Sequence, residues 1–402
     1  MDNKNKIELT YIGKENKRRI LAEKPSANLV KVKSLGNSRL DGWENILIWG
    51  DNFTALQILC QNLSIKGKVR LIYVDPPFST NQVYKRGEDR TATVSKSDMD
   101  RKAYEDILVG SEYLEFLRKR LILLREILAN DGSIYVHIDC KMGHYVKVLM
   151  DEVFGQERFI NDITRIKCNP KNFARKGYGN VKDMILFYSK TDNYIWHEPR
   201  EEMTEEDIKR LFPKVDKDGR RYTTTPLHAP GETRSGPTGQ PWKGLRPPKG
   251  RHWRYSPDEL NRLDEQGLIE WSSTGNPRKI IYADDVLARG KKRQDIWEFK
   301  DPPYPTYPTE KNLEMLKVII ESSSNPDDIV LDCFAGSGTT LVAAEETGRR
   351  WIGIDNSKVA IEIAQKRLTS IKNHSAFGLY EIPPSSEPNR SLASRQFLKK
   401  QQ

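Results

Sequence analysis

Apolar residues along this chain fall into two kinds of pattern. Short continuous runs of strand-forming residues predict strands at 45–49, 71–74, 133–138, 160–166, 184–188, 328–332 and 351–355. Apolar residues that recur every three or four positions predict helices at 53–63, 104–129, 146–153, 255–268, 315–320 and 341–346. Alternation of strand and helix favours parallel pairing with right-handed crossovers and helices on both faces of the sheet. The chain is therefore expected to be an α/β protein.

Three stretches depart from this alternation. Residues 1–43 are polar and basic, with one short strand predicted at 7–12, and we interpret them as an arm or peripheral flap. Residues 79–102 are rich in charges and hydroxyls and predict a flexible loop that covers a substrate. Residues 385–402 predict a disordered tail.

A basic, loop-rich region interrupts the alternation in the middle of the chain. Arginines and lysines are interleaved with aromatic residues on a Pro/Gly-rich background, which suits contacts with phosphates and base edges. A loop-rich insertion with solvated charges would show the same composition. The predicted division is an arm (1–43), a first half of the main domain (44–190), an insertion (191–290), a second half of the main domain (291–384) and a tail (385–402).

Charge and hydropathy narrow the class of protein. The 402 residues include 66 Lys and Arg against 56 Asp and Glu, a formal charge of +10 that favours an anionic partner, although solvated lysines alone would give the same balance. No apolar run approaches the roughly 20 residues that span a bilayer, and the polar N-terminal residues lack the apolar core of a signal peptide. We expect a cytoplasmic, nucleoid-associated protein.

Cysteine and histidine spacing favours neither a metal site nor disulfides. The six histidines show no metal-ligand spacing, and the four cysteines stand far apart without a Cys-x-x-Cys pair. We expect the cysteines to be reduced and buried. They are Cys60, Cys140, Cys168 and Cys333.

The strand at 71–74 runs directly into Asp75-Pro76-Pro77-Phe78. Prolines stop the strand's ladder, so Asp75 is predicted at the carboxyl end of a buried strand, where open α/β sheets bind ligands. An exocyclic amine of a nucleobase must be held by its protons before its lone pair can attack. Asp75 and the Pro76 carbonyl can accept those protons, and Phe78 can stack on an extruded base. A capped turn after a strand is the alternative interpretation.

A second motif follows the strand at 328–332. It reads Cys333-Phe334-Ala335-Gly336-Ser337-Gly338-Thr339-Thr340, continues into a helix and leads to a strand that ends in Asp355. Strand, Gly-x-Gly turn, helix, strand and acid together predict a Rossmann-like nucleoside site, with the acid on ribose hydroxyls. The lighter glycine pattern suits a nucleoside without pyrophosphate, such as S-adenosylmethionine. Thr309 and Lys311, before the helix at 315–320, are placed near the charged tail of that cofactor.

For three other features a structural role explains the sequence better than a catalytic or binding role does. Asp301-Pro302-Pro303-Tyr304 repeats the form of the tetrad, but it lies in a proline-dense connector after a charged segment. His137 ends a predicted strand and is assigned to packing, because methyl transfer to an amine requires only proton loss to solvent. Asp51 follows Gly50 and is best explained as a helix cap that can also reach a ligand.

The order of these parts resembles the β-group DNA amino-methyltransferases from about Ile46 to Leu368. The features that carry the resemblance are Asp75-Pro76-Pro77-Phe78, the basic insertion and Phe334-Ala335-Gly336-Ser337-Gly338, in that order. A weaker similarity connects Gly50-Asp51-Asn52 with the modification subunits of type III restriction systems. The tetrad ends in Phe where Tyr is commoner, which keeps the stacking face.

The resemblance implies a fold, a reaction and a set of site residues. The fold would be a Rossmann-like, seven-stranded, mostly parallel sheet with permuted motif order and an inserted target-recognition region. The reaction would be base flipping followed by methyl transfer from S-adenosylmethionine to adenine N6. The implied catalytic residues are Asp75, Pro76, Pro77 and Phe78; the cofactor residues are Asp51, Thr309, Lys311, Phe334, Ala335, Gly336, Ser337, Gly338, Thr339 and Asp355. DNA contacts are expected from Arg220, Arg221, Lys243, Lys249, Arg251 and Arg254.

Partners and competing functions complete the expectations. The resemblance implies double-stranded DNA as substrate, a homodimer and, in a restriction–modification system, a nuclease partner. Cytosine-N4 methylation shares every motif, although N4 enzymes usually begin the tetrad with Ser. A protein or RNA amine methyltransferase more often begins it with Asn and places the glycine turn first. A non-catalytic DNA-binding subunit with the same fold is the alternative from another class.

Overall fold

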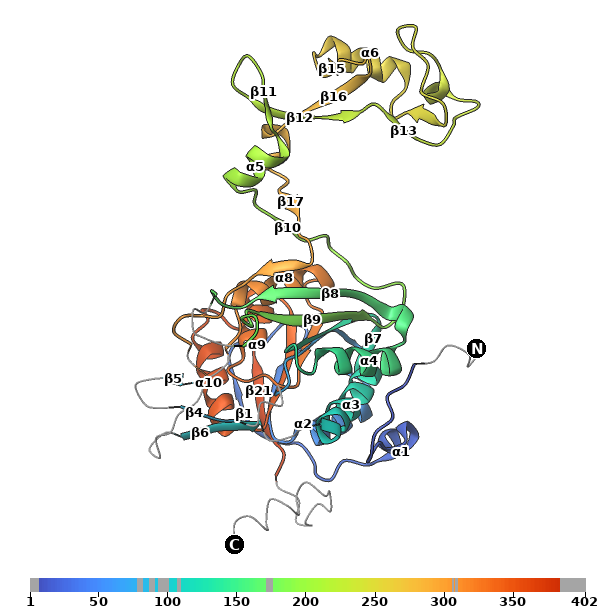
Figure 1. The fold of residues 1–402 in the computed structure, drawn as a ribbon. Helices are drawn as coiled ribbons and strands as arrows, with labels where there is room; N and C mark the ends of the chain where they lie inside the picture. The colour runs from blue at the N-terminus through green and yellow to red at the C-terminus, as the bar shows by residue number, and fades with distance from the viewer. Residues whose placement is uncertain are drawn as a thin grey trace. The chain divides into compact units, whose positions relative to one another are not determined.

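A computed structural model describes residues 7–77, 110–170, 176–305, 307 and 310–383, together with the backbone of 82–86, 91–92 and 101–106. Contacts divide the chain into two compact units (Figure 1). One is made of Met1–His197 and Gln294–Gln402, and the other of Glu198–Arg293.

The first unit is built on one large sheet. Its strands, in spatial order, are β1 (Val30–Leu35), β21 (Phe377–Glu381), β2 (Asn45–Trp49), β20 (Arg350–Asp355), β19 (Ile329–Asp332), β3 (Val69–Val74), β7 (Leu128–Ile138), β9 (Lys182–Ser189), β8 (Phe159–Ile166) and β18 (Ile296–Glu298). The five strands from β2 to β7 are parallel, and β9 is antiparallel to both its neighbours. The expected seven strands form the middle of this ten-stranded sheet.

Three strands at the edges account for the difference. Val30 and Val32 of β1 alternate with lysines but are exposed, and the strand joins the sheet by antiparallel pairing with β21. At the opposite edge the three-residue strand β18 pairs in parallel with β8. These two edge strands depend mainly on backbone pairing, and the short apolar pattern of each was not interpreted as a strand.

Helices cover both faces of the sheet (Figure 1). On one face α2 (Asn52–Gln61), α3 (Gly110–Ile127) and α4 (Gly143–Phe154) bury Ile72 and Val74 of β3. On the other face α8 (Leu313–Ser323), α9 (Thr339–Glu346) and α10 (Lys358–Thr369) bury Leu71 and Tyr73 of the same strand. Both faces of a central strand are therefore core, as its continuous apolar run predicted.

The segment that follows the tetrad differs from the expected loop. Its described parts are three short strands in the order β5 (Thr91–Ala92), β4 (Gln82–Arg86) and β6 (Arg101–Asp106). Because β6 takes up residues at the predicted start of the next helix, α3 begins at Gly110 and not at residue 104. The prediction of a structureless loop over 79–102 was therefore wrong in part.

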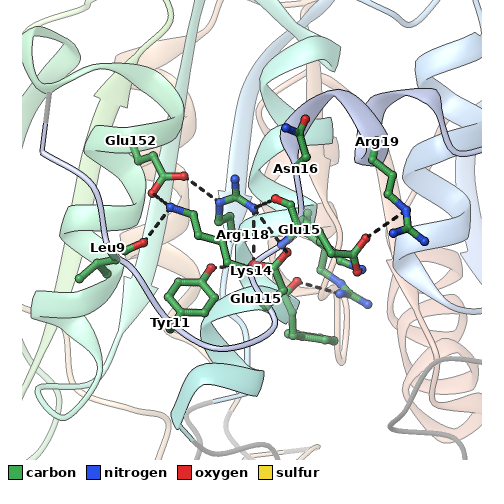
Figure 2. A network of polar contacts seen from close by, with 12 residues as sticks. Leu9, Tyr11, Lys14, Glu15, Asn16, Arg19, Glu115, Arg118 and Glu152 are labelled. Atoms are coloured by element: carbon green, nitrogen blue, oxygen red, sulfur yellow. Dashed lines mark hydrogen bonds and ion pairs between the residues drawn. The ribbon is translucent and has the colours of Figure 1, made fainter. Parts of the chain in front are cut away.

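The N-terminal arm is docked against α3 and α4 (Figure 2). Residues 7–12 form no strand, contrary to prediction, and a short helix α1 (Lys17–Ala22) follows. The Tyr11 hydroxyl donates to Glu115 at 2.6 Å, and Lys14 Nζ lies 2.9 Å from Glu152 Oε2. Arg118 Nε donates to the other oxygen of Glu152 at 2.8 Å. The arm is therefore part of the unit and not a peripheral flap.

The second unit is small and rich in β-strands. Its strands are β10 (Arg200–Glu201), β11 (Lys214–Val215), β12 (Arg221–Pro226), β13 (His228–Pro230), β14 (Arg251–Trp253), β15 (Ile269–Trp271), β16 (Pro277–Tyr282) and β17 (Lys291–Lys292). Its helices are α5 (Glu205–Leu211), α6 (Pro257–Glu265) and α7 (Asp284–Leu287). Trp242 and Trp253 are the large buried side chains of its hydrophobic core. Helix α6 begins at Pro257 after the cap Ser256 and lies within the helix predicted at 255–268.

Two expectations from composition can be compared with the described residues. Among them, none of the helices has the length and apolar character needed to cross a membrane. All four cysteines are free, but only Cys333 is buried and Cys140 is exposed, so the expectation of four buried cysteines was wrong.

Candidate functional site

Acidic residues stand at the carboxyl ends of four neighbouring parallel strands. Asp51 follows β2, Asp355 ends β20, Asp332 ends β19 and Asp75 follows β3. Carboxyl ends of parallel strands lie at one edge of the sheet. Both predicted motifs therefore meet at this edge, although more than 250 residues separate them in the sequence.

The turn between β19 and α9 requires glycine at two positions. Gly336 has φ +51° and Gly338 has φ +77°, both in the left-handed region that disfavours side chains. A Cβ on Gly338 would lie 2.8 Å from Cβ of Ala364 in α10. Glycine at 338 therefore lets the turn pack closely against α10, and both glycines allow the left-handed backbone of a Gly-x-Gly turn, the kind of turn that nucleoside sites use.

Two carboxylates, the buried Asp332 and the half-buried Asp355, hold this turn in place. Asp332 accepts a hydrogen bond from Phe334 N at 2.9 Å and another from the Thr340 hydroxyl at 2.6 Å. Asp355 accepts one from Gly336 N at 2.8 Å. Burial raises the pKa of Asp332 to about 7 and also raises the pKa of Asp355. Asp355 therefore stands beside the glycine turn, as the Rossmann-like pattern predicted.

Asp75 pairs with Lys311 at the end of β3. Lys311 Nζ lies 2.8 Å from Asp75 Oδ2, and only 8% of Lys311 is exposed. The other oxygen, Oδ1, is buried and has no hydrogen-bond partner among the described residues. A buried acceptor without a partner is costly in a folded protein unless a ligand satisfies it. Asp75 therefore presents one unsatisfied acceptor at the ligand-binding edge of the sheet.

The remaining residues of the tetrad and of the Lys311 segment are described only in part. Pro76 is buried and Pro77 is half-buried, whereas Phe78 and Thr309 lie outside the described residues. Lys311 was expected at the charged tail of a cofactor, but the described contact is with the carboxylate of Asp75.

Asp51 acts as the helix cap that its sequence context predicted. Its Oδ2 accepts a hydrogen bond from Thr54 N at 2.9 Å, and Oδ1 lies 3.3 Å from Arg120 Nη2. More than half of its side chain is exposed, so the same carboxylate is open to a ligand. Asp51 thus fits both roles that the sequence left open.

Comparison with known proteins places this site in a family. A family model described as DNA methylase matches residues 69–366, a range that contains both motifs and the insertion between them. The chain belongs to the DNA methylase family. This methylase has the α/β sheet expected of the family, and the methyl donor of the family is S-adenosylmethionine.

Individual relatives agree with that assignment. The type II methyltransferase M.EcaI of Enterobacter cloacae is 43% identical over 369 residues, which cover 90% of this chain and 77% of that one. The Mod subunit of the type III restriction-modification enzyme EcoP15I of Escherichia coli is 25% identical and matches 84% of this chain. The methylase spans only 61% of that subunit. The solved M1.HpyAVI–SAM complex aligns with 80% of this chain and 99% of that one, at 17% identity and a TM-score of 0.42.

His137 of the methylase lies in a buried polar network. Its Nδ1 is 2.7 Å from the Tyr73 hydroxyl, and its Nε2 is 3.3 Å from Asp183. Burial lowers the pKa of His137, which favours the neutral ring. Asp301, the first residue of the repeated tetrad, accepts a hydrogen bond from the buried Arg165 at 2.5 Å. Both features serve internal contacts in the described structure.

Two positioning residues of the methylase escaped sequence analysis. Arg120 of α3 donates to Asn52 Oδ1 at 2.5 Å and to Phe116 O at 2.8 Å. Its guanidinium also lies over the Phe116 ring, 3.5 Å from the centroid, and that ring neighbours Phe334. Arg120 lies three residues after Leu117 on the apolar stripe of α3, so helical spacing could have shown that it faces inward.

The second missed residue is Arg367 of α10. Its Nη1 donates to the Ser337 and Thr339 hydroxyls, both at 2.9 Å, and lies 3.0 Å from Glu310 Oε1. Arg367 therefore ties the glycine turn to the segment that carries Lys311. No local pattern marks it, because a basic residue in the last turn of a helix is ordinary.

The residues predicted to contact DNA all lie in the second unit, in two different environments. Arg220 lies 3.2 Å from Asp284 and stacks on the Tyr282 ring, and Lys243 pairs with Asp264. Arg221 donates to the Phe212 carbonyl. The other three are exposed residues in or beside the β13–β14 hairpin and its loop. They are Lys249, Arg251 and Arg254.

Proposed function

We propose that the methylase transfers a methyl group from S-adenosylmethionine to N6 of an adenine flipped out of double-stranded DNA. The observation that carries the proposal is the state of Asp75. One of its oxygens is paired with Lys311, and the other is a buried acceptor without a partner in the described structure. An amine proton of the target base would supply the missing partner.

The residues around the glycine turn fit the cofactor. Gly336 and Gly338 give the turn the left-handed backbone of a Gly-x-Gly nucleoside site, and Asp355 offers a carboxylate beside it. Asp51 follows β2, which lies two strands away from β19 in the sheet, and its exposed carboxylate would complete the cofactor site. When bound, S-adenosylmethionine supplies a methyl group on a positively charged sulfur, which is the electrophile of the reaction.

The catalytic contribution of the chain is positioning and hydrogen bonding. Asp75 Oδ1 and the Pro76 carbonyl would each accept an N–H of the target amine, which turns the nitrogen lone pair toward the methyl carbon. These hydrogen bonds strengthen as nitrogen becomes tetrahedral and gains positive charge, so they stabilise the transition state more than the ground state. The proton released afterwards needs no buried base, which agrees with the internal hydrogen bonds of His137.

The second unit would supply the DNA contacts. In it, Lys249, Arg251 and Arg254 are exposed, and Arg251 Nη1 is 3.1 Å from His228 Nδ1. Arg220 and Lys243 already have acidic partners, which lowers the charge they offer to phosphates. We therefore assign the main phosphate contacts to the β13–β14 hairpin and its flanks.

Adenine is preferred over cytosine because the tetrad begins with Asp. Adenine-N6 enzymes of the family usually carry Asp at this position and cytosine-N4 enzymes usually carry Ser. The family to which the chain belongs covers both amines, so N4 methylation of cytosine is the second candidate. The EcoP15I Mod subunit is by its name part of a restriction-modification enzyme, and we place the methylase in such a system, as a homodimer with a nuclease partner.

Replacement of Asp75 tests the reaction. Asp75→Asn keeps the shape of the side chain but turns one oxygen into a donor, so methyl transfer from labelled cofactor to host DNA should fall at least about 100-fold. Cofactor affinity, measured by calorimetry, should change less than threefold.

Asp301→Asn is the matched control, since it makes the same change at the repeated tetrad. We expect it to retain activity per folded molecule. Turnover near the wild-type rate by Asp75→Asn would contradict the proposal.

A further inference from the structure

Lys311 lies in a short segment, residues 310–312, whose side chains are linked to both sequence motifs. The residue before it, Glu310, is held by Arg367, which also binds Ser337 and Thr339 of the glycine turn. The residue after it, Asn312, caps α8 by accepting a hydrogen bond from Met315 N at 3.1 Å. The backbone of Lys311 is thus fixed on both sides: by the glycine turn, through Glu310 and Arg367, and by the start of α8, through Asn312.

The side chain of Lys311 reaches from segment 310–312 to Asp75. Its Nζ is 2.8 Å from Asp75 Oδ2, and the side chains of Lys311 and Asp75 are 9% and 16% exposed. Breaking such a largely buried pair from one side leaves an uncompensated charge, so the two groups hold each other firmly. Because Oδ2 is taken by Lys311, Oδ1 is the oxygen that remains for a ligand.

We propose that Lys311 is a positioning residue for Asp75 and not an anchor for the charged tail of the cofactor. The inference rests on the proposed function. The ammonium group fixes the rotation of the carboxylate and directs Oδ1 toward the target amine. Through the contact of Glu310 with Arg367, segment 310–312 also fixes the distance between this carboxylate and the glycine turn.

The two roles predict opposite kinetics. A positioning residue acts on the step after both substrates have bound, and a misplacement of about 1 Å costs roughly 100-fold in rate. A cofactor anchor acts on binding, so its loss raises the dissociation constant of the cofactor but leaves turnover at saturation near normal. The split between affinity and turnover therefore separates them.

The test compares Lys311→Met and Lys311→Arg with the full-length wild-type protein. Calorimetry with S-adenosylmethionine should give dissociation constants within threefold of one another. Single-turnover methyl transfer to host DNA at saturating cofactor should fall about 100-fold in Lys311→Met. Lys311→Arg keeps the charge and should recover at least tenfold of that loss.

Two further variants guard the interpretation. Lys317→Met, which removes another lysine from α8 whose partners are Glu314 and Glu346, should change neither quantity. Adding Lys311→Met to Asp75→Asn should lower the rate no further, because Lys311 acts through Asp75. This double variant also removes the uncompensated charge and protects the test if Lys311→Met folds poorly.

A rise of more than tenfold in the cofactor dissociation constant of Lys311→Met, with turnover at saturation near the wild-type value, would overturn the inference. Additive losses in the double variant would do the same. Failure of the wild-type protein to methylate DNA at all would instead contradict the proposed function, so the two failures are distinguishable.

Discussion

At the scale of single residues, the site is defined by which buried charges have partners. Asp75 is paired with Lys311 through one oxygen, whereas Asp332 accepts hydrogen bonds from a backbone N–H and a hydroxyl. Asp332 also lies near the negative charge of Asp75, which adds to burial in raising its pKa to about 7.

The raised pKa of Asp332 predicts a pH-dependent contribution to stability. The folded protein holds a proton on Asp332 that the unfolded chain loses near pH 4, so this contribution is full below pH 4 and is lost as pH rises to about 7. Asp332→Asn does not titrate. Relative to wild type, the variant should therefore gain up to about 4 kcal/mol in free energy of unfolding between pH 4 and 7, with a plateau above.

Urea unfolding at a series of pH values measures this difference. Asp328→Asn serves as the control, because Asp328 lies just before β19, accepts a hydrogen bond from Asn325 N and has Arg70 nearby. A constant difference between Asp332→Asn and wild type over the whole range would mean that Asp332 is ionised in the folded protein.

At the scale of elements, the sequence predicted the strands and helices that have a local hydrophobic pattern. It did not predict the contacts between residues far apart in the chain. The strands at 71–74, 328–332 and 351–355 were predictable because both faces of each are apolar, and Asp75, Gly336 and Asp355 were predictable because they follow those strands directly. The pairing of Lys311 with Asp75 was not predictable.

That pairing depends on the path of a segment 236 positions further along the chain, which no local period encodes. The edge strand β1 and the short strands β4 to β6 escaped for a related reason. Each has only a few apolar residues among many charged ones, so backbone pairing with a distant strand or with its neighbours reveals them better than the sequence does.

The N-terminal arm is an element whose role is tested by stability. Arg118 is buried and sits between Glu115 and Glu152, so its loss removes the cation beside Glu115 and leaves Glu152 with Lys14 alone (Figure 2). Arg118→Met should lower the free energy of unfolding by about 3 kcal/mol. Tyr11→Phe removes one hydrogen bond from the same network and should cost about 1 kcal/mol.

Urea denaturation monitored by tryptophan fluorescence measures both variants. Arg19→Met is a suitable control, because Arg19 is 80% exposed and its ion pair with Glu15 is 4.0 Å long. Equal stability of Arg118→Met and Arg19→Met would show that the arm network contributes nothing to folding.

At the scale of the whole molecule, one methyltransferase unit is assembled from two separated stretches of sequence. Met1–His197 supplies Asp75, and Gln294–Gln402 supplies Lys311 and the glycine turn. The intervening unit, Glu198–Arg293, carries the exposed basic hairpin. If the inserted unit makes the DNA contacts that we propose for it, target choice can vary without disturbance of the sheet that holds Asp75 and the glycine turn.

The central claim is that the chain methylates an exocyclic amine of DNA, and that the base is adenine. Unmethylated host DNA incubated with the wild-type protein and S-adenosylmethionine can be digested to nucleosides and analysed by mass spectrometry. The account predicts N6-methyladenine in that digest and its absence with Asp75→Asn. N4-methylcytosine would contradict the choice of base, and no methylated nucleoside at all would contradict the account itself.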